Sequence, residues 1–260
     1  MTDLTSAQAH ALRLKIIDAE GDIAERQKEI AGWKAMLGDE APAGEKPAQA
    51  VDPLTIPLPA IQGPFTFQGW SNPWASNAFK KDLYEFHRDN VKLVDGALVF
   101  TVTEGKSGQA QTHENQKSKA ALFEIDATTD RGISGLIQAP LYLYGDNAHE
   151  VDFEVIGTKG LQLAIHTDKK FNAYQKLIPG DFAGRHRYGI SYKAGEEIVW
   201  YLDGKEIGRV KASDLPAGQF PTNALKPFAE TWPTGNVGWA GPWTHTASTM
   251  IVHGYRRTAL

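Results

Sequence analysis

Residues 149–157, His-Glu-Val-Asp-Phe-Glu-Val-Ile-Gly, alternate acidic and apolar side chains. Successive side chains of a β-strand point to opposite faces of its sheet, so this alternation indicates a strand that is buried on one side. Glu150, Asp152 and Glu154 then share one face, and the apolar residues between them share the other. We expect the apolar face to lie in a hydrophobic core and the acidic face to lie on an open surface.

Similar short runs recur on both sides of this stretch, separated by Gly, Asp, Asn and Pro. They are GALVFTV (96–102), KAALFEIDA (119–127), GLQLAIHT (160–167) and EEIVWYLDG (196–204). Many short strands with turn signals every 8–12 residues are typical of an antiparallel sandwich or barrel. No amphipathic helix of ordinary length is evident among them. Residues 64–260 therefore predict an all-β domain of two stacked antiparallel sheets.

The preceding residues have a different pattern. From Leu12 to Leu37, residues that are apolar or small, apart from Arg26, recur at intervals of four and three, which is the heptad spacing of a coiled coil. We expect segment 1–38 to contain one helix over 5–37, which forms a homo-oligomer, packs on its own domain or stands alone as a surface helix. Segment 39–63 carries five prolines. Because proline fixes φ and removes a donor, this segment predicts an extended linker.

The composition of the 260-residue chain excludes several functions. It has no cysteine, which excludes disulfides, thiolate metal sites and cysteine nucleophiles. Its formal net charge is −4, which gives no electrostatic basis for binding nucleic acid or an anionic membrane. No run of 18 apolar residues predicts a membrane span, and no signal peptide is evident, so the localisation stays open. Metal-ligand, phosphate-loop and dinucleotide motifs are lacking, and we predict no cofactor.

The acidic face of 149–157 is the candidate functional feature. Adjacent carboxylates repel, and the repulsion raises the pKa of at least one of them. One protonated and one ionised acid can then coexist near neutral pH, which is what glycoside cleavage needs. Glu150 and Glu154 have Cα atoms about 13 Å apart, and their long side chains could lean to the carboxyl separation of about 5–5.5 Å of a retaining mechanism. Spacing alone leaves a solvated strand face or a structural calcium site as alternatives.

The motif Glu-x-Asp-x-Glu, followed here by Val-Ile-Gly, resembles the signature of glycoside hydrolase family 16, the laminarinase, lichenase and xyloglucan transglycosylase group. The motif has the un-bulged form that lichenases and xyloglucan transglycosylases share. Other segments are similar to that family in the same order: LFEIDATTDRGISGLIQAPLYLYG (122–145), DFAGRHRYGISY (181–192), IVWYLDGKEIGRV (198–210) and FAETWPTGNVGWAGPW (228–243). The resemblance covers about residues 65–257.

This resemblance implies a concanavalin A-like β-jelly roll with a concave glycan cleft. It implies a retaining endo-β-glycanase that acts on a β-glucan, with β-1,3-1,4-glucan favoured by the un-bulged strand. Glu150 is then the nucleophile, Glu154 the general acid/base and Asp152 the residue that assists them. Trp232 is expected to stack on a sugar, because an aromatic ring suits the apolar face of a pyranose.

Further substrate contacts are expected from Trp239, Tyr142, Tyr144, His166, Trp200 and Glu230. Glu230 begins Glu-Thr-Trp where the family often has Asn-Leu-Trp, so it would add a fourth acid near the cleft. Tyr142 and Tyr144 share one face of a strand, and Pro140 before them predicts a bulge or a sheet edge. Trp200 lies in a hairpin, where its ring would belong either to the core or to the cleft wall.

Other functions remain open from the sequence. The same concave face could belong to a non-catalytic glycan-binding module, although binding alone does not require both glutamates. A second sugar in place of water would make the protein a transglycosylase. A helix and a linker before a polysaccharide-degrading domain also suggest a virion-associated phage protein that degrades a surface glycan. In each case the expected partner is a polysaccharide.

Overall fold

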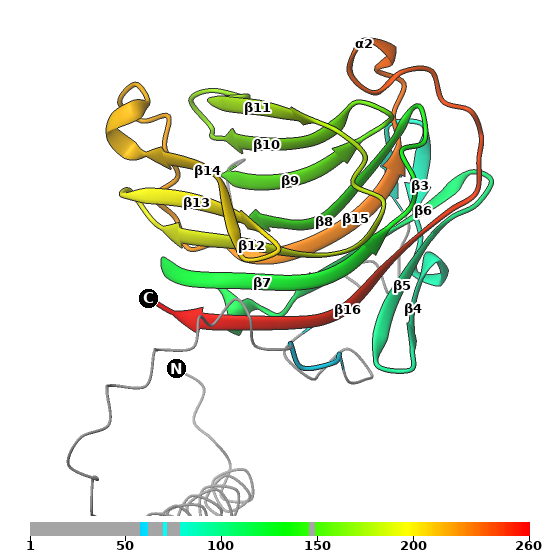
Figure 1. Ribbon diagram of the computed structural model, residues 1–260, viewed down its shortest axis with the longest axis horizontal. Helices are drawn as coiled ribbons and strands as arrows, with labels where there is room; N and C mark the ends of the chain where they lie inside the picture. Colours follow the sequence, from blue (N-terminus) through cyan, green and yellow to red (C-terminus); the bar gives the residue numbers. More distant parts are fainter. Residues whose placement is uncertain (1–57, 62–69, 72–78, 146–148) are drawn as a thin grey trace, which may run out of the picture. The chain divides into compact units, whose positions relative to one another are not determined.

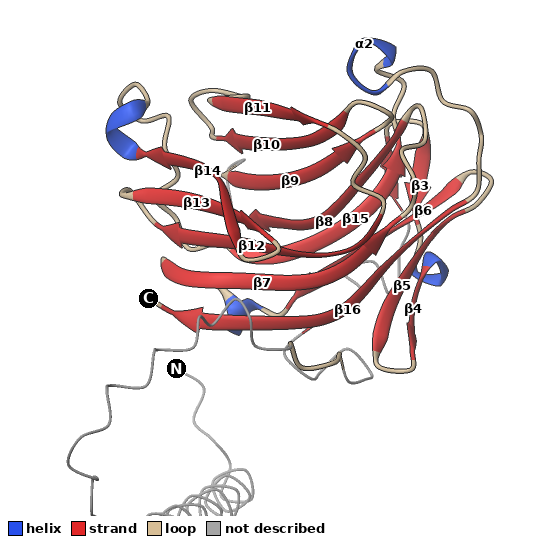
Figure 2. Cartoon of the chain, in the orientation of Figure 1, coloured by secondary structure: helices blue, strands red, loops and turns tan. Residues whose placement is uncertain are grey.

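The computed structural model describes residues 58–61, 70–71, 79–145 and 149–260. The predicted helix over 5–37, and most of the predicted linker, lie outside the described residues. Within the described ranges, two twisted sheets face each other and the few helices are single turns (Figures 1 and 2). None of these helices has the length and apolar character that crossing a membrane requires.

One sheet has nine strands in the described part of the chain. Their spatial order is β11 (Tyr174–Pro179), β10 (Gly160–His166), β9 (Glu150–Ile156), β8 (Leu136–Tyr144), β15 (Lys226–Pro233), β6 (Lys106–Thr112), β3 (Tyr84–Phe86) and β2 (Phe79–Lys81), with β1 (Trp70–Ser71) also paired to β6. The acidic strand β9 therefore lies inside the sheet. The pair β3–β6 is parallel, so the expectation of purely antiparallel sheets is wrong at this edge.

The second sheet has seven strands in the same described ranges. Their order is β14 (Lys205–Lys211), β13 (Glu197–Leu202), β12 (Gly184–Lys193), β7 (Ala120–Thr129), β16 (Ser248–Ala259), β5 (Ala97–Val102) and β4 (Val91–Val94). The short helices are η3 (Arg88–Asn90), η4 (Glu114–Gln116), η5 (Ala212–Asp214) and α2 (Val237–Ala240). This arrangement confirms the predicted two-sheet, all-β architecture.

The core between the sheets contains the apolar face of β9. Val151 and Phe153 are fully buried there, and the ring of Phe153 meets that of Tyr188 on β12 edge-on at 5.3 Å. Trp200 on β13 is also fully buried in this core, and its Nε1 donates to the backbone carbonyl of Asp152 at 3.0 Å. The interpretation of Trp200 as a substrate contact is therefore wrong, because the sheet that carries it turns its ring away from solvent.

Strand β8 contains a bulge that decides which of its side chains face the core. The pairing of β8 with β9 shifts between Gln138 and Leu141, so that Ala139 and Pro140 occupy the place of one residue. Proline lacks an N–H, and a bulge accommodates this loss inside a sheet. Because β8 has strands on both sides, the bulge predicted at Pro140 is confirmed and the sheet edge is excluded. Beyond the bulge Leu141 joins the core, whereas Tyr142 faces the other way.

Part of the predicted linker packs on the β-domain. Ile61 is fully buried in the core, and Ala60 forms an isolated bridge with Gly254 of β16. A Cβ at Gly254 would lie 2.8 Å from the carbonyl oxygen of Pro59, so this close approach needs glycine. Residues 58–61 therefore belong to the folded domain and not to a spacer.

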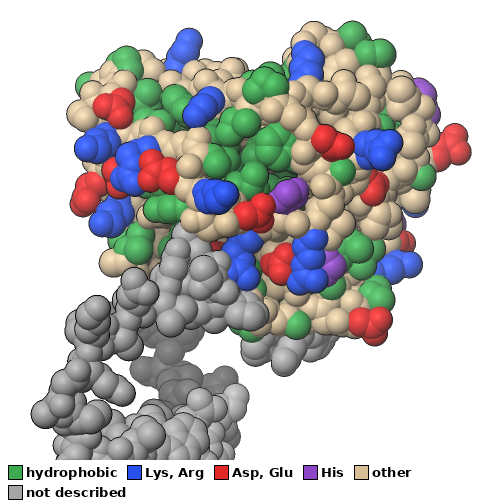
Figure 3. Space-filling view, in the orientation of Figure 1, with side chains coloured by type: hydrophobic (Ala, Val, Ile, Leu, Met, Phe, Trp, Pro, Cys, Tyr) green, Lys and Arg blue, Asp and Glu red, His purple; other side chains and the backbone are tan. Residues whose placement is uncertain are grey.

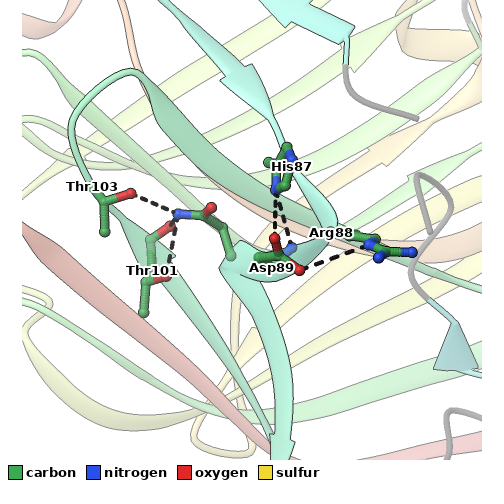
Figure 4. Close-up of polar contacts among 6 residues, drawn as sticks. His87, Arg88, Asp89, Thr101 and Thr103 are labelled. Atoms are coloured by element: carbon green, nitrogen blue, oxygen red, sulfur yellow. Dashed lines mark hydrogen bonds and ion pairs between the residues drawn. The ribbon is translucent and has the colours of Figure 1, made fainter. Parts of the chain in front are cut away.

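A polar turn connects the two sheets where η3 leads from β3 into β4 (Figure 4). Asn90 is buried there, and its Nδ2 donates to the backbone oxygen of Thr101 at 3.0 Å and to the hydroxyl of Thr103 at 3.1 Å. On the other side of the turn, His87 Nδ1 accepts a hydrogen bond from the backbone N–H of Asp89 at 3.3 Å. The two bonds of Asn90 satisfy its amide nitrogen, which is buried at the crossing between the sheets.

Candidate active site

The acidic face of β9 lines a cleft of about 470 Å³. Glu150, Asp152 and Glu154 all reach it, which confirms the predicted alternation of side chains along this strand. The other lining residues come from neighbouring strands and loops: Asp82, Gln162, His166, Phe171, Asn172, Gln175, Glu230, Trp232, Thr234, Asn236 and Trp239. Carboxylates, amides and aromatic rings thus share one surface.

Glu154 is placed to hold a proton near neutral pH. Burial raises the pKa of its carboxyl from 4.5 to about 7, and the negative charges of Glu150 and Glu230 act in the same direction. Gln162 lies opposite Glu154 on β10 and donates a hydrogen bond to its Oε2 at 2.9 Å, which opposes this rise. Protonated and ionised forms of Glu154 therefore coexist near pH 7, as a group that serves as both acid and base requires.

Asp152 is buried between the two glutamates and contacts His166. The Nε2 of His166 lies 3.0 Å from Oδ2 of Asp152. The other ring nitrogen, Nδ1, accepts a hydrogen bond from the backbone N–H of Asn172 at 3.0 Å. In a neutral imidazole this bond places the proton on Nε2, where it faces Asp152. Burial lowers the pKa of His166, which favours that neutral form.

Glu230 is a fourth carboxylate in the cleft, held by two donors beneath it. The hydroxyl of Tyr142 donates to Glu230 Oε2 at 2.7 Å, and Gln109 Nε2 donates to the same oxygen. Burial and the charge of Glu230 raise the pKa of Tyr142 well above its usual value, so its hydroxyl remains a donor. The three residues lie on β15, β8 and β6, and strand pairing brings them together.

Two tryptophans form the wall of the cleft beside Glu154. Trp232 of β15 and Trp239 of α2 have ring centroids 6.0 Å apart, inclined at 47°. The indole Nε1 of Trp239 donates to the side-chain oxygen of Gln162 at 3.3 Å. Because an indole N–H can only donate, this bond turns the amide nitrogen of Gln162 toward Glu154.

Asp82 positions the loop that carries Trp239. Its Oδ2 accepts hydrogen bonds from the hydroxyl of Thr234 at 2.6 Å and from the backbone N–H of Gly235 at 2.9 Å. At the start of α2, the side chain of Asn236 accepts from the backbone N–H of Trp239 at 3.1 Å. Hydrogen bonds within the turn at residues 234–236 therefore fix the position of Trp239 in the cleft wall.

The structure brings some of the predicted substrate contacts to the cleft and excludes others. Trp232, Trp239, His166 and Glu230 line it, whereas Tyr142, Tyr144 and Trp200 do not. Tyr142 is buried below Glu230, where its ring packs on Phe228 at 5.2 Å. Tyr144 meets the same Phe228 ring edge-on at 5.7 Å. The two tyrosines share a strand face as predicted, but Tyr142 is buried and Tyr144 is half-buried against Phe228.

Besides Asp82, Thr234 and Asn236, the sequence interpretation missed a group of three cleft-lining residues, Phe171, Asn172 and Gln175. They belong to the loop and strand that follow β10. A phenylalanine within the polar stretch Lys-Lys-Phe-Asn was the available signal, since it stands outside any alternating pattern. Within the described ranges, no three His, Asp or Glu side chains are arranged to hold a metal ion.

A comparison with protein-family models decides the family. The model for glycosyl hydrolases family 16 matches residues 80–252, which is more than half of the chain. This chain belongs to glycosyl hydrolase family 16. The matched region of this family 16 protein contains the acidic strand, the aromatic wall and the loop after β10. No curated protein matches the chain by sequence.

Solved structures similar to this family 16 domain include glucanases and one pseudo-enzyme. A β-1,3-1,4-glucanase (lichenase) from a mouse hindgut metagenome is 18% identical, with a TM-score of 0.62 over 74% of this chain and 94% of the other. The Bacillus licheniformis β-glucanase is 17% identical, with a TM-score of 0.60 over 74% and 92%. An immunostimulatory antigen and pseudo β-1,3-glucanase of Mycobacterium tuberculosis is 16% identical, with a TM-score of 0.60 over 80% and 97%. At these identities the likeness concerns the fold.

Replacing Glu230 by Gln is expected to move the basic limb of the pH–activity profile to lower pH. If Glu154 has the expected role of general acid, it must be protonated, so activity should fall as the pH rises through about 7. Glu230 raises the pKa of Glu154 by its charge, and glutamine removes that charge while keeping an acceptor for Tyr142. The profile of kcat/KM for wild type and Glu230→Gln measures the effect. A basic limb at the same pH in Glu230→Gln and wild type would contradict this prediction. Glu206→Gln, on the other sheet, is the control and should leave the profile unchanged.

Proposed function

We propose that this protein is a retaining endo-β-glycanase that hydrolyses a β-glucan-type polysaccharide, with β-1,3-1,4-glucan favoured. One observation carries the proposal. A single strand places Glu150 and Glu154 in one cleft, and the environment raises the pKa of Glu154 to about 7. A carboxylate and a protonated carboxylic acid are thereby available together at neutral pH. The regular pairing of β9 with β10 supports the un-bulged form of the motif.

In this mechanism Glu154 and Glu150 act on the two sides of one glycosidic bond. Glu154 donates its proton to the leaving oxygen while a carboxylate oxygen of Glu150 attacks the anomeric carbon. The C–O bond to the leaving sugar breaks, and a covalent glycosyl-enzyme forms. The ionised Glu154 then accepts a proton from water, whose oxygen attacks the anomeric carbon and releases Glu150. The two inversions together retain the configuration of the sugar.

Asp152 and His166 position the carboxylates in this proposal. Asp152 lies between the glutamates on one strand face, and the Nε2–H of His166 faces it at 3.0 Å. In the tryptophan wall, Trp239 is half-buried and supplies most of the apolar surface for a pyranose ring, whereas Trp232 is 7% exposed and supports it from below.

The configuration of the first-formed product tests the mechanism. We expect proton NMR of a β-glucan digest to show the β-anomer of the new reducing end first, with the α-anomer appearing later by mutarotation. An α-anomer formed first would contradict a retaining mechanism. A panel of β-1,3-1,4-, β-1,3- and β-1,4-glucans, with product sizes measured by chromatography, tests the linkage and the endo mode. With a defined oligosaccharide as substrate, products longer than that oligosaccharide would identify transglycosylation, because hydrolysis only shortens the chain.

A glycan-binding module without catalysis is the second candidate. One structural neighbour is described as a pseudo β-1,3-glucanase, so this fold also occurs in a protein that is not described as an active glucanase. Binding of a polysaccharide without release of reducing ends would favour this candidate. Release of reducing ends that is lost in Glu154→Gln would exclude it.

The charge of the cleft leads us to expect discrimination against anionic glycans. Five carboxylates line it, and its lining in the described part of the chain includes no Lys or Arg. On the face seen in Figure 3, acidic and basic side chains are interspersed, with no block of positive charge. Like charges in a confined cleft repel, so an anionic substituent on the sugar should weaken binding.

Carboxymethylation of the substrate tests this expectation. We predict that kcat/KM for a carboxymethylated β-glucan is at least about 10-fold lower than for the unmodified polymer at low ionic strength. Added salt should narrow the difference, because salt screens charge repulsion. A hydroxyethylated β-glucan of matched substitution controls for bulk. Equal rates for the carboxymethyl and hydroxyethyl polymers at every salt concentration would contradict the prediction.

A further inference from the structure

Phe171 is an exposed aromatic ring at the border of the cleft. It is 70% exposed, although it is a large apolar side chain, and it lines the cleft together with the carboxylates. Its ring stacks on the imidazole of His166 with centroids 4.3 Å apart and planes inclined by only 17°. The stack covers one face of the Phe171 ring and leaves most of the side chain open to solvent.

The loop between β10 and β11 holds this ring in place. The backbone N–H of Thr167 donates to the carbonyl of Lys170 at 3.1 Å, and the hydroxyl of Thr167 accepts from the N–H of Lys170 at 3.2 Å. Asn172 follows with a φ of 58°, a left-handed conformation that asparagine tolerates better than most residues. Its N–H bonds to His166, the residue on which the Phe171 ring stacks. Hydrogen bonds of the residues before and after Phe171, together with the stack on His166, therefore hold its ring in one orientation.

Phe171 and the tryptophan wall flank the carboxylates on opposite sides. His166, which carries the Phe171 stack, pairs with Glu150 across β10 and β9, whereas Gln162, which bonds to Trp239, pairs with Glu154. His166 and Gln162 are four residues apart on one strand, or about 13 Å. A glycan that is cleaved between Glu150 and Glu154 and stacks on the tryptophan wall must extend further to reach Phe171.

We propose that Phe171, with Asn172 and Gln175, forms a second sugar-binding platform that takes the apolar face of a neutral pyranose on the Glu150 side of the cleft. The proposal rests on the proposed glycanase function. An aromatic ring covers the C–H face of a sugar, and neighbouring amides bind its hydroxyls. Asn172 and Gln175 both line the cleft beside the ring and supply those amides. The platform would add binding energy only for chains long enough to span the cleft.

An isolated exposed apolar side chain on a protein surface usually needs no special explanation. Phe171 differs in three respects, since it lines the cleft, has a fixed ring orientation and adjoins amides that line the same cleft. Val94 provides the contrast, because it is 47% exposed in the other sheet and is absent from the cleft lining. Val94→Ala is therefore a control for the loss of an exposed apolar side chain.

The experiment measures how activity depends on substrate length. Mixed-linkage β-1,3-1,4-glucan oligosaccharides of increasing length are the probes, with wild type, Phe171→Ala, Phe171→Trp and Val94→Ala. We expect Phe171→Ala to lower kcat/KM by about 3- to 10-fold for the longest oligosaccharides, mainly through KM, with little effect on the shortest. Phe171→Trp should restore the dependence on length. Because Phe171 is exposed, the thermal unfolding midpoint of Phe171→Ala should match that of wild type.

Calorimetric binding to the longest oligosaccharide in a Glu150→Gln background separates the platform from the chemistry. A dissociation constant raised by Phe171→Ala, and restored by Phe171→Trp, supports the platform, even if wild type proves unable to cleave and the glycanase proposal fails. Cleavage by wild type with a length dependence that Phe171→Ala leaves unchanged overturns the platform alone. Equal losses at every length, or the same losses in Val94→Ala, also overturn it. If no oligosaccharide of the panel is bound or cleaved, both proposals fall.

Discussion

Replacing Glu150 by Gln is expected to lower kcat/KM on β-glucan by a factor on the order of 10⁴ or more. Glutamine keeps the shape of the side chain and its place on the cleft face of β9, but its amide cannot attack the anomeric carbon. Since Glu150 lies in a row with Asp152 and Glu154, removing its charge also relieves repulsion on that face. Folding should therefore survive, and reducing-sugar release together with circular dichroism measures both effects.

Glu154→Gln is expected to lower kcat/KM by about 10²- to 10⁴-fold, because it removes the proton donor. Its effect should depend on the leaving group. An aryl glycoside with a good leaving group needs no protonation in its first step, so the loss in that step should be smaller than for the polysaccharide. Glu206→Gln, a matched change of an exposed glutamate on β14, should leave activity at the wild-type level. Wild-type turnover in Glu150→Gln or in Glu154→Gln would contradict the assignment.

Glu154→Gln is also expected to change the pH dependence of stability. The pKa of Glu154 is raised in the folded state, so the folded protein retains its proton while the unfolded chain loses it above about 4.5. Wild type therefore loses stability as the pH rises from about 4.5 through 7, by on the order of 2 kcal/mol, and the glutamine variant does not. Urea unfolding at pH 5 and pH 8 checks this. An equal loss of stability between pH 5 and pH 8 in Glu154→Gln and in wild type would contradict it.

The second large expected effect concerns Trp200, whose replacement by Ala should lower the free energy of unfolding by about 3–5 kcal/mol. The ring is fully buried between the sheets, stacked on Tyr174 at 5.8 Å, and its Nε1 bonds to the carbonyl of Asp152. Alanine leaves a cavity in the core and removes the hydrogen bond from the ring to the strand that carries the carboxylates. Urea unfolding of Trp200→Ala and wild type, followed by circular dichroism, measures the loss.

Trp239→Ala is the matched comparison for this prediction. Trp239 is half-buried at the cleft, so its removal should cost less folding free energy but should raise KM for the glycan. Without Trp239, the side-chain oxygen of Gln162 loses its hydrogen bond to the indole. The amide nitrogen of Gln162 is then no longer held toward Glu154. A Trp200→Ala variant that unfolds like wild type but binds glycan weakly would contradict the assignment of Trp200 to the core and of Trp239 to glycan binding.

The alternation along β9 could be predicted from the sequence because it is a local property. Side chains of an extended chain alternate whatever the strand pairs with, so Glu150, Asp152 and Glu154 had to share a face. The same reasoning predicted which neighbours enter the core, such as Phe153. It also predicted a bulge at Pro140, because proline lacks a donor for the ladder.

The cleft wall was predicted only in part: Trp232 and Trp239 line it as expected, whereas Trp200 does not. All three are tryptophans in or next to predicted strands or loops, but their positions differ. Trp200 is in the core, whereas Trp232 on β15 and Trp239 on α2 form the cleft wall. Tyr142 lies on the predicted side of β8, but Glu230 and Phe228 cover it. Which ring is covered depends on strands that are far away in the sequence.

By itself the sequence determined the all-β architecture, the acidic strand face and the resemblance to a glycanase family, because these follow from periodicity and motif order within short segments. Only the tertiary structure decided which residues surround the acids. Pairing β9 with β10 brought Gln162 and His166 to the carboxylates, and pairing β15 with β8 and β6 joined Glu230 to Tyr142 and Gln109. The physical reason is that burial, charge repulsion and hydrogen bonding depend on distance in space, and this distance is set by sheet pairing between segments remote along the chain.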